Sequence, residues 1–317
     1  MKKRIISVLL ATVFALSVIG CGTKDTKEQD AYRQYGITCM ESGKYEDAVK
    51  AFQNALGESI GHIGEKELDI CFYKAKAQAL DGKTKDALAT YNAIIKYNKD
   101  ARAYYLRGDL YMDMGEEKKG RADFESAVQQ GKKNYEIYIG IYESLSRHEK
   151  KDEGQKYLSA AMEIKGDKAE DELYKGRISY LLGENKDAIS YLEKAKEHKQ
   201  MLASYYLGLA YDANGDSDKA KKCIAEYIKS GVATSYDLYE LGMQEMQDGN
   251  YKNALTYFNS GLELEKVPNK QNLMKSAIAA YEYSGDFDSA KKMMKEYLKA
   301  YPDDEEAKHE NTFLETR

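Results

Sequence analysis

Four cysteines and four histidines are the residues of this 317-residue chain that most often carry out catalysis or bind metals. No two cysteines form a Cys-x-x-Cys pair and the histidines lie far apart, so the spacing of a zinc or redox site is missing. Among these residues, only Cys21 lies in a sequence context that indicates a chemical role. It follows Lys2-Lys3-Arg4, an apolar run over residues 5–19, and Gly20. This order is typical of a secretory signal with a small residue at its cleavage point.

The residues up to this cysteine, Val18-Ile19-Gly20-Cys21, resemble the lipobox of bacterial lipoprotein precursors, a family that more often has Leu where Val18 stands. The resemblance implies that residues 1–20 are a signal peptide and that Cys21 becomes the lipidated first residue. The apolar run is short for a membrane span, whereas several acyl chains give stable attachment. We therefore predict a cell-membrane protein anchored by lipid on its extracytoplasmic face, with a flexible tether over residues 21–28. The alternative is an ordinary secretory signal with an incidental cysteine.

The charge and composition exclude several classes of protein. Lys and Arg number 48 and Asp and Glu 53, and a net charge of -5 argues against a nucleic-acid partner. No nucleophile with a base, metal-ligand set or phosphate-binding loop has a signature in the sequence. We therefore predict no catalytic residue, no metal, no cofactor and no enzymatic activity. Abundant Lys and Tyr with little Pro and no Trp are compatible with a Gram-positive source.

After residue 28 the chain repeats with a period near 34 residues. A column of small residues, here called the anchor residues, fixes the register at Ala48, Ala87, Gly120, Gly154, Ala188, Ala220, Ala254 and Ala290. A glycine precedes seven of the eight anchors by five residues, and Glu149 takes that place in the fourth repeat. A large apolar residue follows each anchor by four residues, and a mostly small residue precedes it by twelve.

These offsets predict two helices per repeat. An anchor and the residues four and seven positions later lie on one helix face, so a small residue permits close crossing and a large one fills the gap. The recurrent glycine is suited to the left-handed conformation just past a helix end. Each repeat is therefore predicted to be helix, glycine turn, helix.

The first repeat, with Tyr35-Gly36 and Ser42-Gly43-Lys44-Tyr45-Glu46-Asp47-Ala48, resembles the tetratricopeptide repeat. The resemblance implies an all-α fold, an α-solenoid of about eight stacked helix-turn-helix hairpins in a right-handed superhelix. The expected repeats span about 29–62, 68–101, 101–134, 133–168, 169–202, 201–234, 235–268 and 271–304. A polar cap is expected over residues 303–317, after one continuous array of repeats.

Two departures from the repeat pattern predict insertions. In the fourth repeat Gly140 lies fourteen residues before Gly154 rather than twelve, which predicts a two-residue insertion near Arg147-His148. The spacing of 39 between the first two anchors predicts a second insertion near residues 57–67. A tolerated surface loop is the favoured interpretation of that segment, and a functional loop is the alternative.

Members of this family line a concave surface with the first helix of each repeat. The residues fifteen, eleven and eight positions before each anchor share one helix face. This offset, with the fourth repeat shifted, predicts an apolar partner-binding groove of Phe72, Tyr105, Met112, Ile137, Ile141, Leu173, Tyr180, Tyr205, Leu209, Tyr239, Met243 and Met246. Packing of several of these side chains between adjacent hairpins is the alternative.

The leading hypothesis is a monomeric, membrane-anchored extracytoplasmic scaffold that binds a peptide or helix of another protein in this Tyr- and Met-rich groove. One alternative is a non-catalytic accessory or solute-binding subunit of an envelope enzyme or transporter. Another is a self-assembling structural component of the envelope. The sequence names neither the partner nor the pathway.

Overall fold

The computed structural model describes residues 24–59 and 63–317, and its regular structure is entirely helical there. Cys21, the predicted signal peptide over residues 1–20 and His62 lie outside the described residues. The described chain is an α-solenoid of stacked helical hairpins, as the sequence predicts. None of its helices combines the length and the apolar character that a membrane span requires.

The described residues divide into two compact units, residues 24–232 and residues 233–317, where the sequence predicts a single array. The helices of the first unit are α1 (Lys24–Glu41), α2 (Tyr45–Gly57), α3 (Glu65–Leu80), α4 (Thr84–Asn98), α5 (Ala101–Asp113), α6 (Glu117–Gln130), α7 (Tyr135–Arg147), α8 (Lys151–Met162), α9 (Lys168–Leu182), α10 (Asn185–Glu197), α11 (Leu202–Ala213) and α12 (Ser217–Lys229). Those of the second are α13 (Ser235–Gln247), α14 (Tyr251–Leu262), α15 (Lys270–Ser284), α16 (Phe287–Ala300) and α17 (Glu305–Glu315). The boundary follows α12, at Gly231, whose φ is 75°, and the exposed Val232.

Close crossing of the two helices in each hairpin explains the small residues of the pattern. The anchor Ala254 is fully buried on α14, and Phe258, one turn later, fills the space beside it. On the facing helix α13, a Cβ at Gly242 would lie only 2.2 Å from Cε1 of Phe258. Only glycine permits this approach, so the predicted pairing of a small residue with a large one is confirmed here.

The predicted turn glycines have the left-handed backbone that the spacing requires. Gly183, for example, ends α9 with a φ of 82°. Glu149 takes the same conformation in the fourth repeat, with a φ of 62°. It follows the end of α7 by two residues and precedes the start of α8 by two, so the hairpin has the ordinary length. The predicted two-residue insertion near Arg147-His148 is therefore wrong, because a glutamate fills the glycine position without changing the turn.

The fourth repeat differs in its packing instead. Tyr142 stands twelve residues before the anchor Gly154, and a Cβ on Gly154 would lie 3.1 Å from the Cα of Tyr142. The large residue thus comes from the first helix and the small one from the second, the reverse of the usual arrangement. Gly140 faces the preceding repeat, because a Cβ there would lie 2.6 Å from Cζ of Tyr105 on α5.

Both ends of the repeat array contain more helix than the sequence predicts. Residues 24–28, expected as part of a flexible tether, belong to α1, which begins at Lys24. The segment expected as a polar cap forms α17, which buries Ala307 and Leu314 against the last hairpin. Asp304 starts this helix by accepting a hydrogen bond from the backbone N–H of Ala307.

The segment after α2 is tied to its neighbours where the structure describes it. Nε2 of the buried Gln29 donates hydrogen bonds to Oγ of Ser59 over 2.8 Å and to Oε1 of Glu67 over 2.9 Å. The hydroxyl of Tyr97 donates to the carbonyl oxygen of Ile63 over 2.9 Å. Side chains of α1, α3 and α4 therefore hold the two ends of the segment in place.

Candidate functional site

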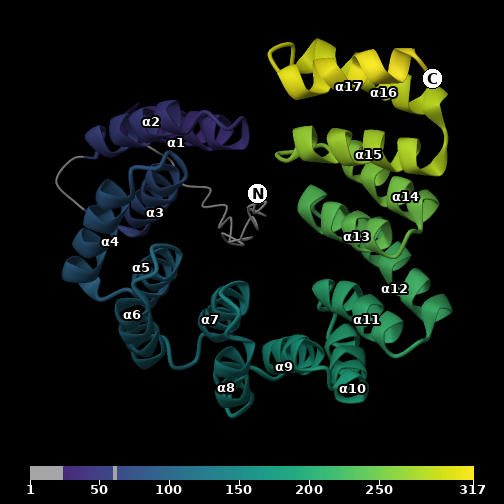
Figure 1. Ribbon diagram of the computed structural model, residues 1–317. Helices are drawn as coiled ribbons and strands as arrows, with labels where there is room; N and C mark the ends of the chain where they lie inside the picture. The colour runs from purple at the N-terminus through teal and green to yellow at the C-terminus, as the bar shows by residue number, and fades with distance from the viewer. Residues whose placement is uncertain (1–23, 60–62) are drawn as a thin grey trace. The chain divides into compact units, whose positions relative to one another are not determined.

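Within the first unit the first helices of the hairpins form one layer and the second helices another (Figure 1). Successive first helices touch, as α5 does with α7 and α9 does with α11. Charged residues stand eleven positions before four successive anchors, on α3, α5, α7 and α9: Lys76, Asp109, Glu143 and Arg177. The first-helix layer therefore carries a row of charges rather than the apolar stripe that the sequence predicts.

An ion pair joins the third and fourth repeats across this layer. Arg147 on α7 donates to Oδ1 of Asp109 on α5, and both side chains are largely shielded from solvent. One turn further along, Nε2 of His148 lies 3.2 Å from Oδ1 of Asp113. Two side chains at the end of α7 thus meet two carboxylates at the end of α5.

A second cluster joins the fourth and fifth repeats. Arg177 on α9 donates to both carboxylate oxygens of Glu136, over 3.1 and 3.2 Å, and to Oε1 of Glu143 over 3.2 Å. Its guanidinium lies 5.3 Å from the ring centre of Tyr206 on α11. Tyr174 donates a hydrogen bond to the same Glu136 over 3.0 Å. A single arginine therefore links α7, α9 and α11.

We call Asp109, Asp113, Glu136 and Glu143 the acid cluster; its four carboxylates face two guanidinium groups, those of Arg147 and Arg177. Burial raises the pKa of Glu143, and Glu136 adds to the shift while Arg177 opposes it. Burial and then the charge of Asp109 raise the pKa of Asp113, against the effect of Arg147. In both groups burial is the larger cause, and a neighbouring carboxylate adds to the shift while an arginine opposes it.

A tyrosine hydroxyl without a partner lies beside the acid cluster. The side chain of Tyr105 on α5 is 8% exposed, and its hydroxyl makes no hydrogen bond to any described residue. Burial, followed by the charges of Asp109 and Glu143, raises the pKa of Tyr105 well above its usual value. A buried hydroxyl without a partner is uncommon, because its desolvation is left uncompensated.

Five of the twelve predicted groove residues lie in the core instead. Tyr105, Met112, Ile137 and Ile141 belong to one buried cluster between α5, α6 and α7. Leu173 is buried in a second cluster with α10 and α11. The alternative of packing between hairpins is correct for these five. Ile137 and Ile141 are in the predicted groove only because of the shift assumed for the fourth repeat. That shift does not exist, and the two residues occupy core positions.

The other seven predicted groove residues are half-buried. Phe72 lies under the guanidinium of Arg102, 4.5 Å from the ring centre. Tyr180 lies on α9, less than one turn after Arg177. Tyr205 and Leu209 lie on α11, the helix that also carries Tyr206. Tyr239, Met243 and Met246 belong to the second unit, where they pack against a core of α14 and α15. The predicted groove is thus an aromatic area on α9 and α11, with separate residues elsewhere.

Sequence reasoning missed the charged residues that replace the apolar groove, although a signal for them exists. The offset of eleven residues before an anchor gives Asp109, Glu143 and Arg177 once the fourth repeat is read without a shift. Glu149 keeps the spacing of the turn position, and this spacing is the sequence evidence against a shift. We use the name first-helix face for the surface made by the acid cluster, Arg147, Arg177, Tyr180, Tyr205 and Leu209.

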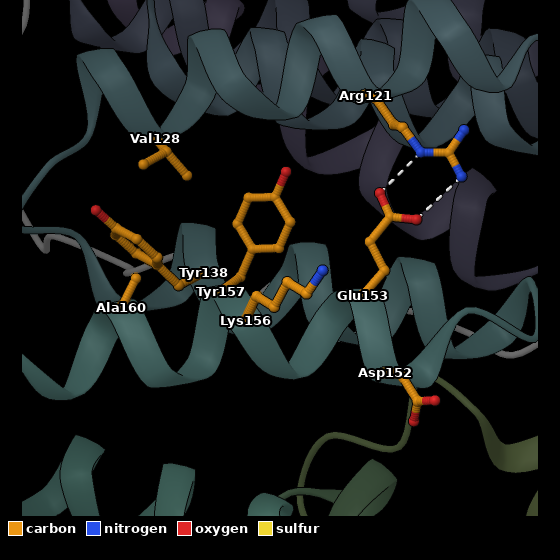
Figure 2. Close-up of a pocket in the computed structure, with 8 residues that line it drawn as sticks. All are labelled: Arg121, Val128, Tyr138, Asp152, Glu153, Lys156, Tyr157 and Ala160. Atoms are coloured by element: carbon orange, nitrogen blue, oxygen red, sulfur yellow. Dashed lines mark hydrogen bonds and ion pairs between the residues drawn. The ribbon is translucent and has the colours of Figure 1, made fainter.

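A cavity of about 700 Å³ lies on the opposite side of the fourth repeat, between α6, α7 and α8 (Figure 2). Figure 2 shows Tyr157 standing between an apolar end with Val128 and a polar end with Arg121. Arg121 donates two hydrogen bonds to Glu153, over 2.8 and 3.0 Å, and one to Glu117 over 2.9 Å. The lining also holds one further cation, Lys156, and one further carboxylate, that of Asp152. Its charges balance, so they favour no charged ligand.

Among residues 24–59 and 63–317, no three His, Cys, Asp or Glu side chains converge as a possible metal site. The cysteine thiols there are free, with Cys39 and Cys223 buried and Cys71 half-buried. Burial raises the pKa of both Cys71 and Cys223, which makes these thiols less reactive.

Sequence models of the tetratricopeptide repeat match the chain at residues 36–95 and 74–135, and again at 202–230 and 271–304. The matched segments fall on α1–α6, α11–α12 and α15–α16, about half of the chain in all. None of the curated proteins compared with this chain matches it.

Many solved structures resemble the chain at low sequence identity. A tetratricopeptide repeat protein from Parabacteroides merdae is 12% identical, with a TM-score of 0.46 over 80% of this chain and 99% of that one. PilW, a type IV pilus biogenesis factor, is 18% identical, with a TM-score of 0.43 over 66% of this chain and 97% of that one. The APC/C hetero-tetramer Cut9–Hcn1 is 16% identical, with a TM-score of 0.43 over 85% of this chain and 52% of that one.

Proposed function

Because this chain is built from tetratricopeptide repeats, which mediate protein–protein interactions, we propose that it is a lipid-anchored scaffold on the extracytoplasmic face of a bacterial cell membrane. It binds a segment of a partner protein on the first-helix face. Tetratricopeptide repeat proteins are generally non-catalytic, and binding without catalysis agrees with the chemistry of that face. The observation that carries the proposal is the continuity of the face, since side-chain pairs join α5, α7, α9 and α11.

The aromatic area supplies the contact surface for such a segment. Tyr205 and Leu209 lie one turn apart on α11, so both side chains are on one side of the helix. Tyr180 on α9 lies close enough to Asp212 of α11 for that carboxylate to add to the rise in its pKa, of which burial is the main cause. Half-buried tyrosine offers large contact area at little entropic cost, as at many protein interfaces.

In-cell photo-crosslinking tests the binding face. A photoreactive phenylalanine placed at Leu209 should crosslink one specific partner, whereas the same residue at Tyr191, on the second-helix side, should not. Equal crosslinking from both positions, or none from Leu209, would contradict the proposal. Crosslinks solely to a second copy of the chain would favour a self-assembling component instead, and crosslinks to a transporter or enzyme subunit would identify the partner as part of such a complex.

The anchor rests on the sequence around Cys21 and has its own test. Metabolic labelling with a palmitate analogue should label the wild-type chain and should be lost in Cys21→Ser. Cys39→Ser, which changes a buried thiol, should keep the label. Protease added to intact protoplasts should digest the protein if it lies on the outer face. A labelled Cys21→Ser variant, or full protection from protease, would refute this part of the proposal.

A further inference from the structure

We propose that the acid cluster on α5 and α7 binds a cationic side chain, lysine or arginine, of the partner segment. The inference rests on the proposed function, because it names the chemistry of the partner that the first-helix face takes. The acid cluster was defined above as Asp109, Asp113, Glu136 and Glu143. It is a binding site for positive charge built from two successive first helices.

The first argument is the charge balance of the cluster. Arg147 binds Asp109, Arg177 binds Glu136 and Glu143, and His148 lies beside Asp113. Oε2 of Glu143 and Oδ2 of Asp113 accept no hydrogen bond from the described residues, and more than a third of each side chain is exposed. A cation from outside can therefore reach carboxylate oxygens that the protein's own donors leave unused.

The second argument is independent of the carboxylates. The hydroxyl of Tyr105 is buried beside the cluster and has no hydrogen-bond partner, and its ring is held against Gly140 of α7. A phenol oxygen can accept a hydrogen bond from an ammonium or guanidinium group as well as donate one to a carboxylate. Tyr105 thus marks a polar interior side of the cluster whose hydrogen-bonding capacity is unmet within the described residues.

The shape of the cluster favours a side-chain cation over a metal ion. A metal ion needs several ligands converging on one point, and no three such groups converge among the described residues. A guanidinium or an ammonium on a flexible stem can instead bind carboxylates spread along two helices. Arg177 itself shows this mode, because its guanidinium binds Glu136 and Glu143 at once.

The neighbouring residues add an expectation for the sequence around that cation. Tyr180 follows Arg177 by less than one turn of α9, and Tyr205 and Leu209 lie on α11. Arg177 reaches from the acid cluster to Tyr206 of α11, so charged and aromatic areas meet at this arginine. The partner segment therefore combines a basic residue with an aromatic or aliphatic residue close to it in sequence.

The test measures the binding of three fluorescein-labelled peptides, (Arg-Phe-Gly)3, (Gln-Phe-Gly)3 and (Glu-Phe-Gly)3, to the full-length protein in detergent at 150 mM salt. We expect the arginine peptide to bind at least tenfold more tightly than the glutamine peptide, and the glutamate peptide to bind most weakly. The double variant Asp113→Asn with Glu143→Gln should weaken binding of the arginine peptide about tenfold. Its matched control is Glu125→Gln with Asp152→Asn, which removes the same charge from the second-helix side and should leave binding unchanged.

Equal affinity for the arginine and glutamine peptides would overturn the inference, as would equal losses in the two double variants. The thermal unfolding midpoints of both variants check that a loss of binding is not a loss of folding. If the double variant unfolds early, the single variant Glu143→Gln replaces it, with a smaller expected loss. Crosslinking from Leu209 together with no preference for arginine would refute the cation site and leave the scaffold function standing.

Discussion

Nη2 of Arg177 on α9 lies 3.2 Å from Oε1 of Glu143 on α7, so one guanidinium joins the first helices of the fourth and fifth repeats. The same guanidinium also binds Glu136, and its side chain is only 15% exposed. The carboxylates of Glu136 and Glu143 are more exposed, at 41% and 39%, so the arginine is the shielded member of the cluster. Removal of the arginine leaves both carboxylates without their shared donor.

Arg177→Gln should lower the free energy of unfolding by about 1–3 kcal/mol, because Glu143 and Glu136 lose their shared cation. Glu143→Gln made on top of Arg177→Gln should restore part of that loss. Urea denaturation of the single and double variants measures the coupling between the two residues. Lys50→Gln, which breaks an exposed pair with Glu46, is the control and should change stability by less than about 0.5 kcal/mol. Additive losses at Arg177 and Glu143 would show that the pair is not coupled.

Glu149→Gly should stabilise the protein by about 0.5–1 kcal/mol. Glu149 has a left-handed backbone, with a φ of 62°. This conformation is strained for a residue that has a Cβ atom, whereas glycine adopts it without that strain. The reverse change at the equivalent turn, Gly183→Ala, should destabilise by a similar amount, since its φ is 82°. Denaturant unfolding measures the stability change of each variant. A destabilised Glu149→Gly protein would mean that the glutamate side chain contributes more than its backbone strain costs.

Gly242→Ala should destabilise the second unit by about 1–3 kcal/mol, because the added methyl group meets Phe258 at 2.2 Å. Gly57→Ala is the matched control. It adds the same methyl group near the end of α2, where nothing lies within 4 Å, and alanine favours helix over glycine. Thermal unfolding should therefore show a lower midpoint for the first variant and an equal or higher one for the second.

Tyr105→Phe should leave the free protein as stable as the wild type or up to about 1 kcal/mol more stable, because the lost hydroxyl has no partner to leave behind. Tyr297→Phe is the contrasting variant. Its hydroxyl accepts a hydrogen bond from Gln271 over 2.8 Å and donates one to Asp304 over 2.5 Å, so its loss should destabilise. A destabilised Tyr105→Phe protein would indicate that the hydroxyl has a partner, such as a bound water.

The stability of the last hairpin and α17 should fall as the pH rises from about 4.5 to 7. Burial and then the charge of Glu310 raise the pKa of Glu282 from 4.5 to about 7 in the folded protein. An acid whose folded-state pKa is raised stabilises the fold fully below its unfolded pKa, and this contribution is lost as the pH passes the folded value. Hydrogen exchange of α17 at pH 5 and pH 8 measures the change.

Glu282→Gln is the variant that tests this pH dependence. It should flatten the pH dependence of exchange in α17 and should protect the helix more than the wild type at pH 8. Glu263→Gln changes an exposed residue just after the end of α14, removes the same charge and should leave the dependence as it is. Unchanged pH dependence in Glu282→Gln would assign the effect to another group.

The repeat architecture could be predicted from the sequence because it depends on local rules. Spacing near 34 residues, small residues at helix crossings and glycine at left-handed turns each follow from backbone geometry. Gly242 against Phe258 and the turn at Gly183 agree with those rules in the structure. The shift predicted for the fourth repeat is wrong because Gly140 packs against Tyr105 of the preceding repeat, whereas Gly154 packs against Tyr142, which residue type alone does not reveal.

The amino-acid sequence is enough to establish a helical repeat array, the positions of its turns and which helix of each hairpin comes first. Which residues of the first helices reach the surface depends on how neighbouring helices pack. Tyr105 and Ile141 share a helix periodicity with residues that face outward, and their burial depends on Gly140 letting α5 approach α7. Periodicity fixes the direction of a side chain on its own helix, whereas the neighbouring helix decides whether that direction leads to the core or to solvent.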